Sequence, residues 1–222
     1  MHLITFSGLD GCGKSTHVEA TVDYLKRHDL DARSLLTVNI SATGVILLIR
    51  RLLQRAGSRA LDQKTATAPS GAKIRVYSKG RSFDEDRRRR VVVLKRWLVY
   101  PFDALALRST LAWLSIRGTD AVVCDRWVYD KLVNLPNMSS LLSTLVRWLA
   151  PNPDLALFLD VSPEQARARR EEHDASYYDT KYACYRTLVE QGCGLEALEI
   201  TTIEDTQRRI EQRLRNLGVV TN

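Results

Sequence analysis

Short apolar runs alternate along this chain with longer segments in which apolar residues recur every three or four positions. The short runs predict buried parallel strands, and the longer segments predict amphipathic helices. Strands are expected at residues 2–7, 33–40, 120–125, 154–161 and 195–201. Helices are expected at residues 14–28, 45–55, 85–117, 138–149, 163–172, 175–191 and 204–216. Within the helix at 85–117, Pro101 predicts a break or kink.

The alternation of strands with helices predicts a three-layer α/β fold, in which helices flank a central, mostly parallel five-stranded sheet. The 222 residues suit one domain with a large core. Ligands of such sheets bind at the carboxyl ends of the strands. We therefore expect Asp10, Asn39, Asp125 and the segment after Val161 to converge at that edge.

The loop between the first strand and the first helix reads Gly-Leu-Asp-Gly-Cys-Gly-Lys-Ser, which matches the phosphate-binding pattern G-x-x-x-x-G-K-[ST]. Its backbone N–H groups and the positive end of the following helix are suited to a polyphosphate. The loop predicts binding of ATP or GTP with Mg²⁺. Lys14 is expected to reach the β- and γ-phosphates, and the Ser15 hydroxyl to bind the metal. These features predict a P-loop kinase fold. The expected ATP contacts are Gly8, Gly11, Cys12, Gly13, Lys14, Ser15 and Thr16.

The cysteines and the apolar runs indicate in which cellular compartment the protein is expected. Four scattered cysteines form no C-x-x-C pair, so neither a zinc site nor a disulfide framework is indicated. The N-terminal strand does not have the features of a signal peptide. No uncharged apolar run reaches the ~18 residues of a membrane-spanning helix. The cytoplasm is therefore the expected location.

The formal net charge of +7 is compatible with a nucleic acid, an anionic membrane surface or a small anionic substrate. We expect no nucleic-acid partner and no membrane span, and the basic and apolar segment 87–117 leaves weak contact with a membrane surface open. Residues 57–84 hold mainly small and polar residues with little periodicity, which predicts a mobile loop.

Three segments resemble the thymidylate kinase family. Residues 6–16 are similar to the opening of these kinases, in which an aspartate inside the phosphate loop is characteristic. Asp125-Arg126-Trp127 resembles the family's Asp-Arg-Tyr/His signature, and residues 160–170 resemble its last core strand and arginine-bearing lid. The resemblance covers most of the chain. It implies a single-domain phosphotransferase, residues 1–222, with a lid at about 164–180, that transfers a phosphoryl group from ATP with Mg²⁺ to dTMP.

The resemblance also implies roles for individual residues. Asp10 would contact the 3′-hydroxyl of the acceptor sugar, Arg126 would bridge the acceptor and the transferred phosphate, and Asp125 with Ser15 would organise Mg²⁺. One branch of the family carries a catalytic arginine in the loop, where this chain has Gly11. The expected catalytic residues are therefore Lys14 and Arg126 with the lid arginines Arg167, Arg169 and Arg170.

Aromatic residues are candidates for contact with the acceptor. Trp127 and Phe102 are candidates to stack on its base, with core packing as the alternative for each. Tyr177, Tyr178, Tyr182 and Tyr185 recur in the helix after the lid, and we select Tyr178 as the residue that closes over the base or sugar, while most of this group is expected to pack.

Two departures from the family pattern concern the acceptor phosphate. The stretches Val38–Ala42 and Pro101–Leu105 lack the arginines that the family carries there. A nucleoside monophosphate carries about two negative charges that need cationic partners. Either other cations substitute, with Arg75, Lys79 and Arg81 as candidates and Arg87–Arg90 expected on the surface, or the acceptor differs.

Three functions are thus considered. The first is a thymidylate-kinase-type enzyme that phosphorylates a pyrimidine deoxynucleotide such as dTMP. The second is a P-loop kinase for a nucleoside or a specialised small molecule, with Asp125 or Asp103 as the base. The third is a non-catalytic nucleotide-binding regulatory protein. The family resemblance further implies a homodimer, formed through the helices at 45–55 and 91–117.

Overall fold

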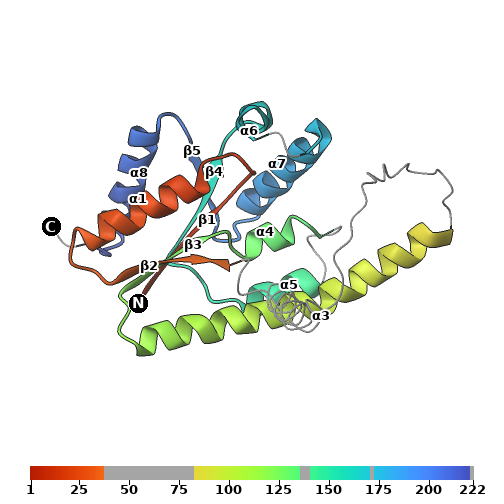
Figure 1. The fold of residues 1–222 in the computed structure, drawn as a ribbon, viewed down its shortest axis with the longest axis horizontal. Helices are drawn as coiled ribbons and strands as arrows, with labels where there is room; N and C mark the ends of the chain where they lie inside the picture. The colour runs from red at the N-terminus through yellow and green to blue at the C-terminus, as the bar shows by residue number, and fades with distance from the viewer. Residues whose placement is uncertain (38–82, 136–140, 171–172, 221–222) are drawn as a thin grey trace, which may run out of the picture.

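A computed structural model describes residues 1–37, 83–135, 141–170 and 173–220 of the protein (Figure 1). Within these ranges, five parallel strands form one sheet in the order β2-β3-β1-β4-β5. The strands are β1 (His2–Ser7), β2 (Ala32–Leu36), β3 (Ala121–Asp125), β4 (Leu155–Asp160) and β5 (Glu196–Glu199). This arrangement confirms the predicted α/β fold of the P-loop kinase type.

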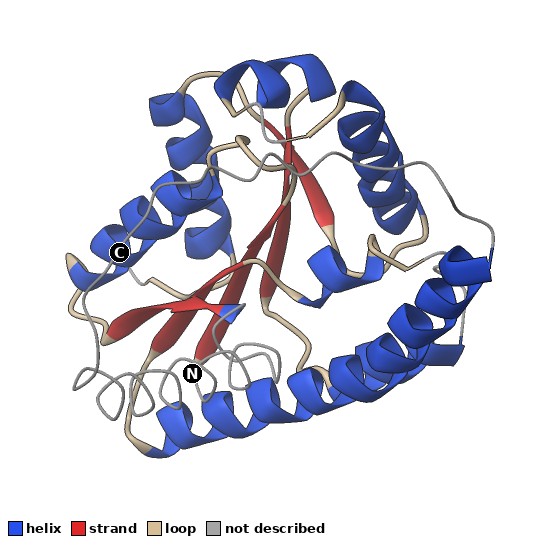
Figure 2. Cartoon of the chain, turned by 45° about the vertical axis from the view of Figure 1, so that its right-hand side comes forward, coloured by secondary structure: helices blue, strands red, loops and turns tan. Residues whose placement is uncertain are grey.

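Helices cover both faces of the sheet. They are α1 (Lys14–Lys26), α3 (Phe83–Ile116), α4 (Val128–Leu132), α5 (Leu141–Leu149), α6 (Pro163–Arg169), α7 (Ala175–Glu190) and α8 (Ile203–Asn216). Helices α1 and α8 pack together on one face, while α3, α5 and α7 lie on the other (Figure 2). The two-sided cover follows from right-handed crossovers, which place a helix on opposite faces when the chain moves in opposite directions along the sheet.

The three central strands supply most of the core. Every residue of Leu3–Ser7, Ala121–Cys124 and Leu155–Leu159 is buried. A strand covered on both faces needs apolar residues at successive positions rather than at alternate ones, and this explains the short unbroken runs in the sequence. Because the parallel register sets Phe6 opposite Asp125, the chain leaves β1 and β3 at the same edge of the sheet.

The predicted helix boundaries hold to within a few residues, with two exceptions. Helix α3 continues through Pro101, so the break is wrong, and the alternative of a kink stays a prediction. Buried residues at Ala104, Leu107 and Leu111, together with packing against α5, offset the backbone hydrogen bond that proline removes. Helix α4 was not predicted.

Several predictions fall outside the described residues. These are the helix at 45–55, the loop up to residue 82, the end of the second strand with Asn39, the candidate cations Arg75, Lys79 and Arg81, and residues 138–140. Phe83 and Asp84, placed in the loop by the sequence, belong to α3. None of the helices in the described ranges combines the length and apolar composition that crossing a membrane requires.

Candidate active site

The phosphate-binding loop curls back over the start of α1. Gly13 caps this helix in a left-handed conformation, with φ of 92°, which glycine adopts without strain. The buried Lys14 donates from Nζ to the backbone oxygens of Gly8 (2.9 Å) and Leu9 (2.7 Å). The ammonium group is therefore held against the loop, at the place where the pattern predicts the phosphates of a nucleotide.

Gly11 lies against α6, which is part of the segment predicted to form the lid. Its φ is +88°, and a Cβ atom built on it would stand 2.5 Å from the backbone oxygen of Ala166 in α6. Real Cβ atoms do not approach a carbonyl oxygen so closely, so a side chain at this position would force α6 away from the loop. The loop thus has no room for an arginine here.

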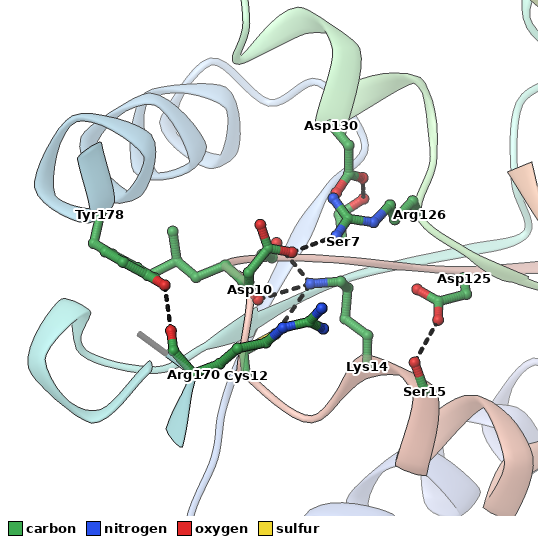
Figure 3. Close-up of polar contacts among 12 residues, drawn as sticks. Ser7, Asp10, Cys12, Lys14, Ser15, Asp125, Arg126, Asp130, Arg170 and Tyr178 are labelled. Atoms are coloured by element: carbon green, nitrogen blue, oxygen red, sulfur yellow. Dashed lines mark hydrogen bonds and ion pairs between the residues drawn. The ribbon is translucent and has the colours of Figure 1, made fainter. Parts of the chain in front are cut away.

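Ser15 and Asp125 meet across the mouth of the loop. The Ser15 hydroxyl donates to Oδ2 of Asp125 at 2.7 Å (Figure 3). A hydroxyl and a carboxylate are hard oxygen ligands of the kind that Mg²⁺ uses beside phosphate oxygens and water, so this pair fits the predicted metal. Clusters of three or more His, Cys, Asp or Glu residues suited to a metal are absent from the part of the chain that the structure describes.

Arg126 follows β3 in a left-handed conformation, with φ of 69°, while its backbone N–H donates to the oxygen of Phe6 at 2.9 Å. This turn directs the guanidinium to the loop, where it forms an ion pair with Asp10 (Figure 3). Burial alone would raise the pKa of Asp10, but the charges of Arg126, Lys14 and Arg170 hold it below its ordinary value. The aspartate therefore stays ionised among three cations.

These groups line one open cleft of about 960 Å³. From the predicted set it contains Asp10, Gly11, Gly13, Lys14, Ser15, Thr16, Asp125, Arg126, Arg169 and Arg170. Four residues that the sequence did not single out complete its wall: Leu36, Ile200, Thr201 and Ile203. Ile200 and Thr201 follow β5, and Ile203 begins α8. They make that end of the cleft partly apolar, which suits the base of a nucleotide better than its phosphates.

A small cavity of about 30 Å³ lies beside this cleft, between the phosphate loop and α7. Asp10 and Arg126 line it together with Tyr177, Lys181 and Tyr185 of α7. The three α7 residues recur at intervals of four, so they share one face of the helix. That spacing is the signal in the sequence that could have identified Lys181 as a residue of this cavity, where its Nζ donates to the backbone oxygen of Val133 at 2.9 Å.

Four candidates lie elsewhere than predicted. Trp127 is 2% exposed and packs in the core, so the alternative of core packing holds for it. Phe102 is 64% exposed on α3, and neither the cleft nor the small cavity contains it. Tyr178 is fully buried and its hydroxyl donates to the backbone oxygen of Arg170. Its neighbour Tyr177 lines the small cavity with Asp10. Arg167 lines a separate cavity with Glu164 and Tyr178.

Cys12 belongs to the loop but faces inward. Its side chain is 1% exposed, and burial raises the pKa of its thiol. Its backbone N–H donates to the oxygen of Leu9 at 3.2 Å. The residue therefore fills space beneath the loop and its side chain does not line the cleft.

Helix α3 meets α4 through an ion pair. Nζ of Lys131 lies 2.6 Å from Oδ2 of Asp103, whose side chain is almost fully buried. The ammonium also lies over the ring of Tyr100, 5.9 Å from its centre. A buried, paired carboxylate is poorly placed to accept a proton from a substrate, so Asp103 lacks the geometry of the base considered for a nucleoside kinase.

Comparison with known proteins finds distant relatives. No family model matches the chain. It is similar to the thymidylate kinase of Prochlorococcus marinus strain AS9601, with 22% identity over 202 residues, 87% of this chain and 82% of the relative. Thymidylate kinases of strain MIT 9312 (22% over 204 residues, 88% and 83%) and strain MIT 9301 (24% over 205 residues, 87% and 82%) are also similar. The likeness spans most of each chain and is thymidylate kinase-like, though distant.

Proposed function

We propose that the protein is a nucleotide kinase that transfers the γ-phosphoryl group of ATP to a nucleoside monophosphate, specifically a pyrimidine deoxynucleotide such as dTMP. The observation that carries the proposal is the Asp10–Arg126 ion pair inside the cleft that also holds Lys14 and the Ser15–Asp125 pair. Lys14, Arg126 and the carboxylate of Asp10 would then surround the phosphoryl group that is transferred. The distant thymidylate kinases support the same activity.

Each residue of the cleft would have a separate role in phosphoryl transfer. Such a reaction needs positioning and positive charge on the transferring oxygens, with little covalent chemistry from the protein. Lys14 would neutralise the β- and γ-phosphates, and Arg126 would hold the transferred group in line with the acceptor. Mg²⁺, when bound through Ser15 and Asp125, neutralises charge on the phosphate chain. Arg169 and Arg170 would supply further charge from the lid, and the closed lid would exclude water.

The acceptor would lie on the far side of Asp10 from ATP. Asp10 accepts hydrogen bonds and so fits a sugar hydroxyl, whereas Arg126 fits a phosphate. Lys181 of α7 lines the small cavity with both of them. Its ammonium donates to the Val133 oxygen and would turn from it to the acceptor phosphate. This lysine is a replacement for the missing family arginines that can be tested within the described residues.

The experiment is a transfer assay with ATP and Mg²⁺ across dTMP, dUMP, dCMP, UMP, CMP, AMP, GMP and thymidine. Turnover of dTMP above the others is the expected result. Preference for another monophosphate would keep the kinase and change the pocket, and turnover of thymidine alone would favour a nucleoside kinase. ATP binding without transfer to any of them would contradict the proposal and favour a regulatory protein. Lys14→Ala, prepared in parallel, controls for contaminating kinases, since its activity should be lost.

A further inference from the structure

Asp130 is a buried carboxylate behind the candidate site. It lies in α4 and is 8% exposed. Oδ2 accepts from the Ser7 hydroxyl at 2.7 Å and from the backbone N–H of Trp127 at 2.9 Å. Oδ1 accepts from the Tyr185 hydroxyl at 2.9 Å. A carboxylate buried this deeply needs such donors, because unpaired it would be costly.

The three donors come from the three parts of the chain that build the site. Ser7 is the last residue of β1 and leads into the phosphate loop. Trp127 directly follows Arg126 and its left-handed turn. Tyr185 comes from α7, the helix that follows the lid and carries Tyr177 and Lys181 on the same face. One side chain therefore connects the phosphate loop, the turn at Arg126 and α7.

Asp130 also faces the arginine itself. Asp130 and Arg126 line the same small cavity, and the guanidinium lies between the carboxylates of Asp10 and Asp130 in the view of Figure 3. Burial alone would lower the pKa of Arg126, but Asp130 and Asp10 hold it above its ordinary value. The two carboxylates differ in position, because Asp10 stands in the open cleft and Asp130 lies behind it.

We infer that Asp130 is a positioning residue for phosphoryl transfer, which fixes the Arg126 guanidinium toward the transferred phosphate from its buried side. The inference rests on the proposed function. Asp10 would be engaged with the acceptor during the reaction, so a second carboxylate is needed to keep the arginine in place. Asp130 serves this purpose without contact to either substrate, since its own oxygens are occupied by Ser7, Trp127 and Tyr185.

Asp130→Asn tests this inference because it removes the charge and keeps the shape. The amide oxygen can accept from Ser7 and Trp127, and the amide nitrogen can donate to Tyr185, whose hydroxyl then turns to the oxygen of Gly8, 3.4 Å away. We expect kcat to fall between about tenfold and a hundredfold, the range for a misplaced catalytic group, with the KM for ATP within about twofold of wild type. A kcat within about twofold of wild type would overturn the inference.

A double variant separates positioning from a structural role. In the Arg126→Ala background, Asp130→Asn should reduce kcat by less than about twofold, because the residue on which it acts is gone. Losses that multiply in the double variant would overturn the inference. Asp154→Asn is the matched control, since Asp154 also accepts a backbone N–H, from Leu3 at 2.7 Å, but at the opposite end of β1. Its kcat should equal that of wild type.

Tyr185→Phe tests the role of Asp130 if Asp130→Asn does not fold. It loosens the same carboxylate, and its loss of kcat should likewise vanish in the Arg126→Ala background.

Calorimetric titration with Mg-ATP and Mg-ADP tests Asp130 if wild type phosphorylates no acceptor and the proposed function fails. Asp130→Asn should then lower the affinity for ATP relative to ADP as Arg126→Ala does, and an unchanged ratio would overturn the inference.

Discussion

Asp10 carries a negative charge into a loop that otherwise attracts anions. Arg126, Lys14 and Arg170 surround it and offset the cost of its burial, so that it remains charged at neutral pH. Because the same carboxylate restrains Arg126, it couples the loop to the turn after β3 even before any substrate is bound. Its contribution to stability should therefore depend on pH.

Asp10→Asn should show this dependence in thermal melts. The pKa of Asp10 is lowered in the folded protein, so its stabilising contribution is fully present above its unfolded pKa of about 3.9 and is lost as pH falls through the folded value. For this partly exposed pair we expect wild type to exceed the variant by about 1 kcal/mol at pH 7, or roughly 2–4 °C in Tm. The gap should close as pH falls below about 4. A gap that widens on acidification would contradict the ion pair.

Arg126→Ala should reduce kcat/KM of the preferred acceptor by about a thousandfold, because an arginine that stabilises charge on a transferring phosphoryl group is worth this much. The control is Arg33→Ala, which removes an exposed arginine paired to Asp31 on β2. That variant should keep wild-type activity. Steady-state kinetics on both proteins provide the measurement, and equal activity of the two would remove Arg126 from the proposed mechanism.

At the level of elements, the phosphate loop packs directly against α6, part of the predicted lid. Gly11 lets α6 approach the loop until the Ala166 oxygen fills the space that a side chain would need. Arg169 and Arg170 at the end of α6 reach the cleft through this contact. The position of these arginines therefore depends on a residue in the loop, outside the lid itself.

Gly11→Ala should displace α6 from the phosphate loop. We expect kcat to fall by about tenfold or more, since the lid arginines lose their position. Gly118→Ala is the matched control: Gly118 has a similar φ of +81°, but among the described residues nothing beyond its chain neighbours lies within 4 Å of the place where a Cβ atom would stand. It should cost about 1–2 kcal/mol of stability through backbone strain and leave kcat unchanged. Equal kinetic losses in the two variants would show that strain alone explains the effect.

Most strands and helices could be predicted because their signals are local. Strands β1, β3 and β4 are buried on both faces and so appear as unbroken apolar runs. Helix α4 has five residues and too few turns to show a period. Pro101 predicts a break by its own chemistry, but tertiary packing of α3 overrides it.

Site residues could be predicted from the sequence where they belong to a short motif of consecutive residues. The loop residues and the Asp125-Arg126 pair are in this class, and their convergence follows from the parallel sheet. The orientation of a side chain depends on packing that one sequence does not show. Trp127 turns into the core while its neighbour Arg126 faces the cleft, and Tyr177 rather than Tyr178 lies beside Asp10.

At the scale of the whole molecule, the cleft draws on distant parts of the chain: the phosphate loop, the end of β3, the end of α6 and the segment between β5 and α8. A ligand that fills it should stabilise the entire fold. Several large apolar residues remain exposed on α3 and α5, namely Phe102, Trp113, Ile116, Leu141 and Trp148. They are compatible with the predicted homodimer, which stays a prediction.

Mg-ATP should raise the melting temperature of the protein. At a concentration of about 100 times Kd, linkage gives about 2.7 kcal/mol, or roughly 5–10 °C for a chain of this size. Chelation of the metal with EDTA should remove much of the shift, because the Ser15–Asp125 pair is expected to act through Mg²⁺. Differential scanning fluorimetry gives the readout, with Lys14→Ala as the control that should not respond. A shift of equal size in that variant would place ATP elsewhere.

The parallel sheet order has a consequence for how the protein forms during synthesis. Strand β1 ends at residue 7, whereas its neighbours β3 and β4 begin at residues 121 and 155. The phosphate loop therefore leaves the ribosome well before the strands that support it, and it gains their support late, since such long-range pairing is slow. A nascent chain that ends before β3 carries the complete glycine pattern but has no sheet to hold it open. Nucleotide therefore stabilises the loop only after β3 and β4 have been synthesised and have paired with β1.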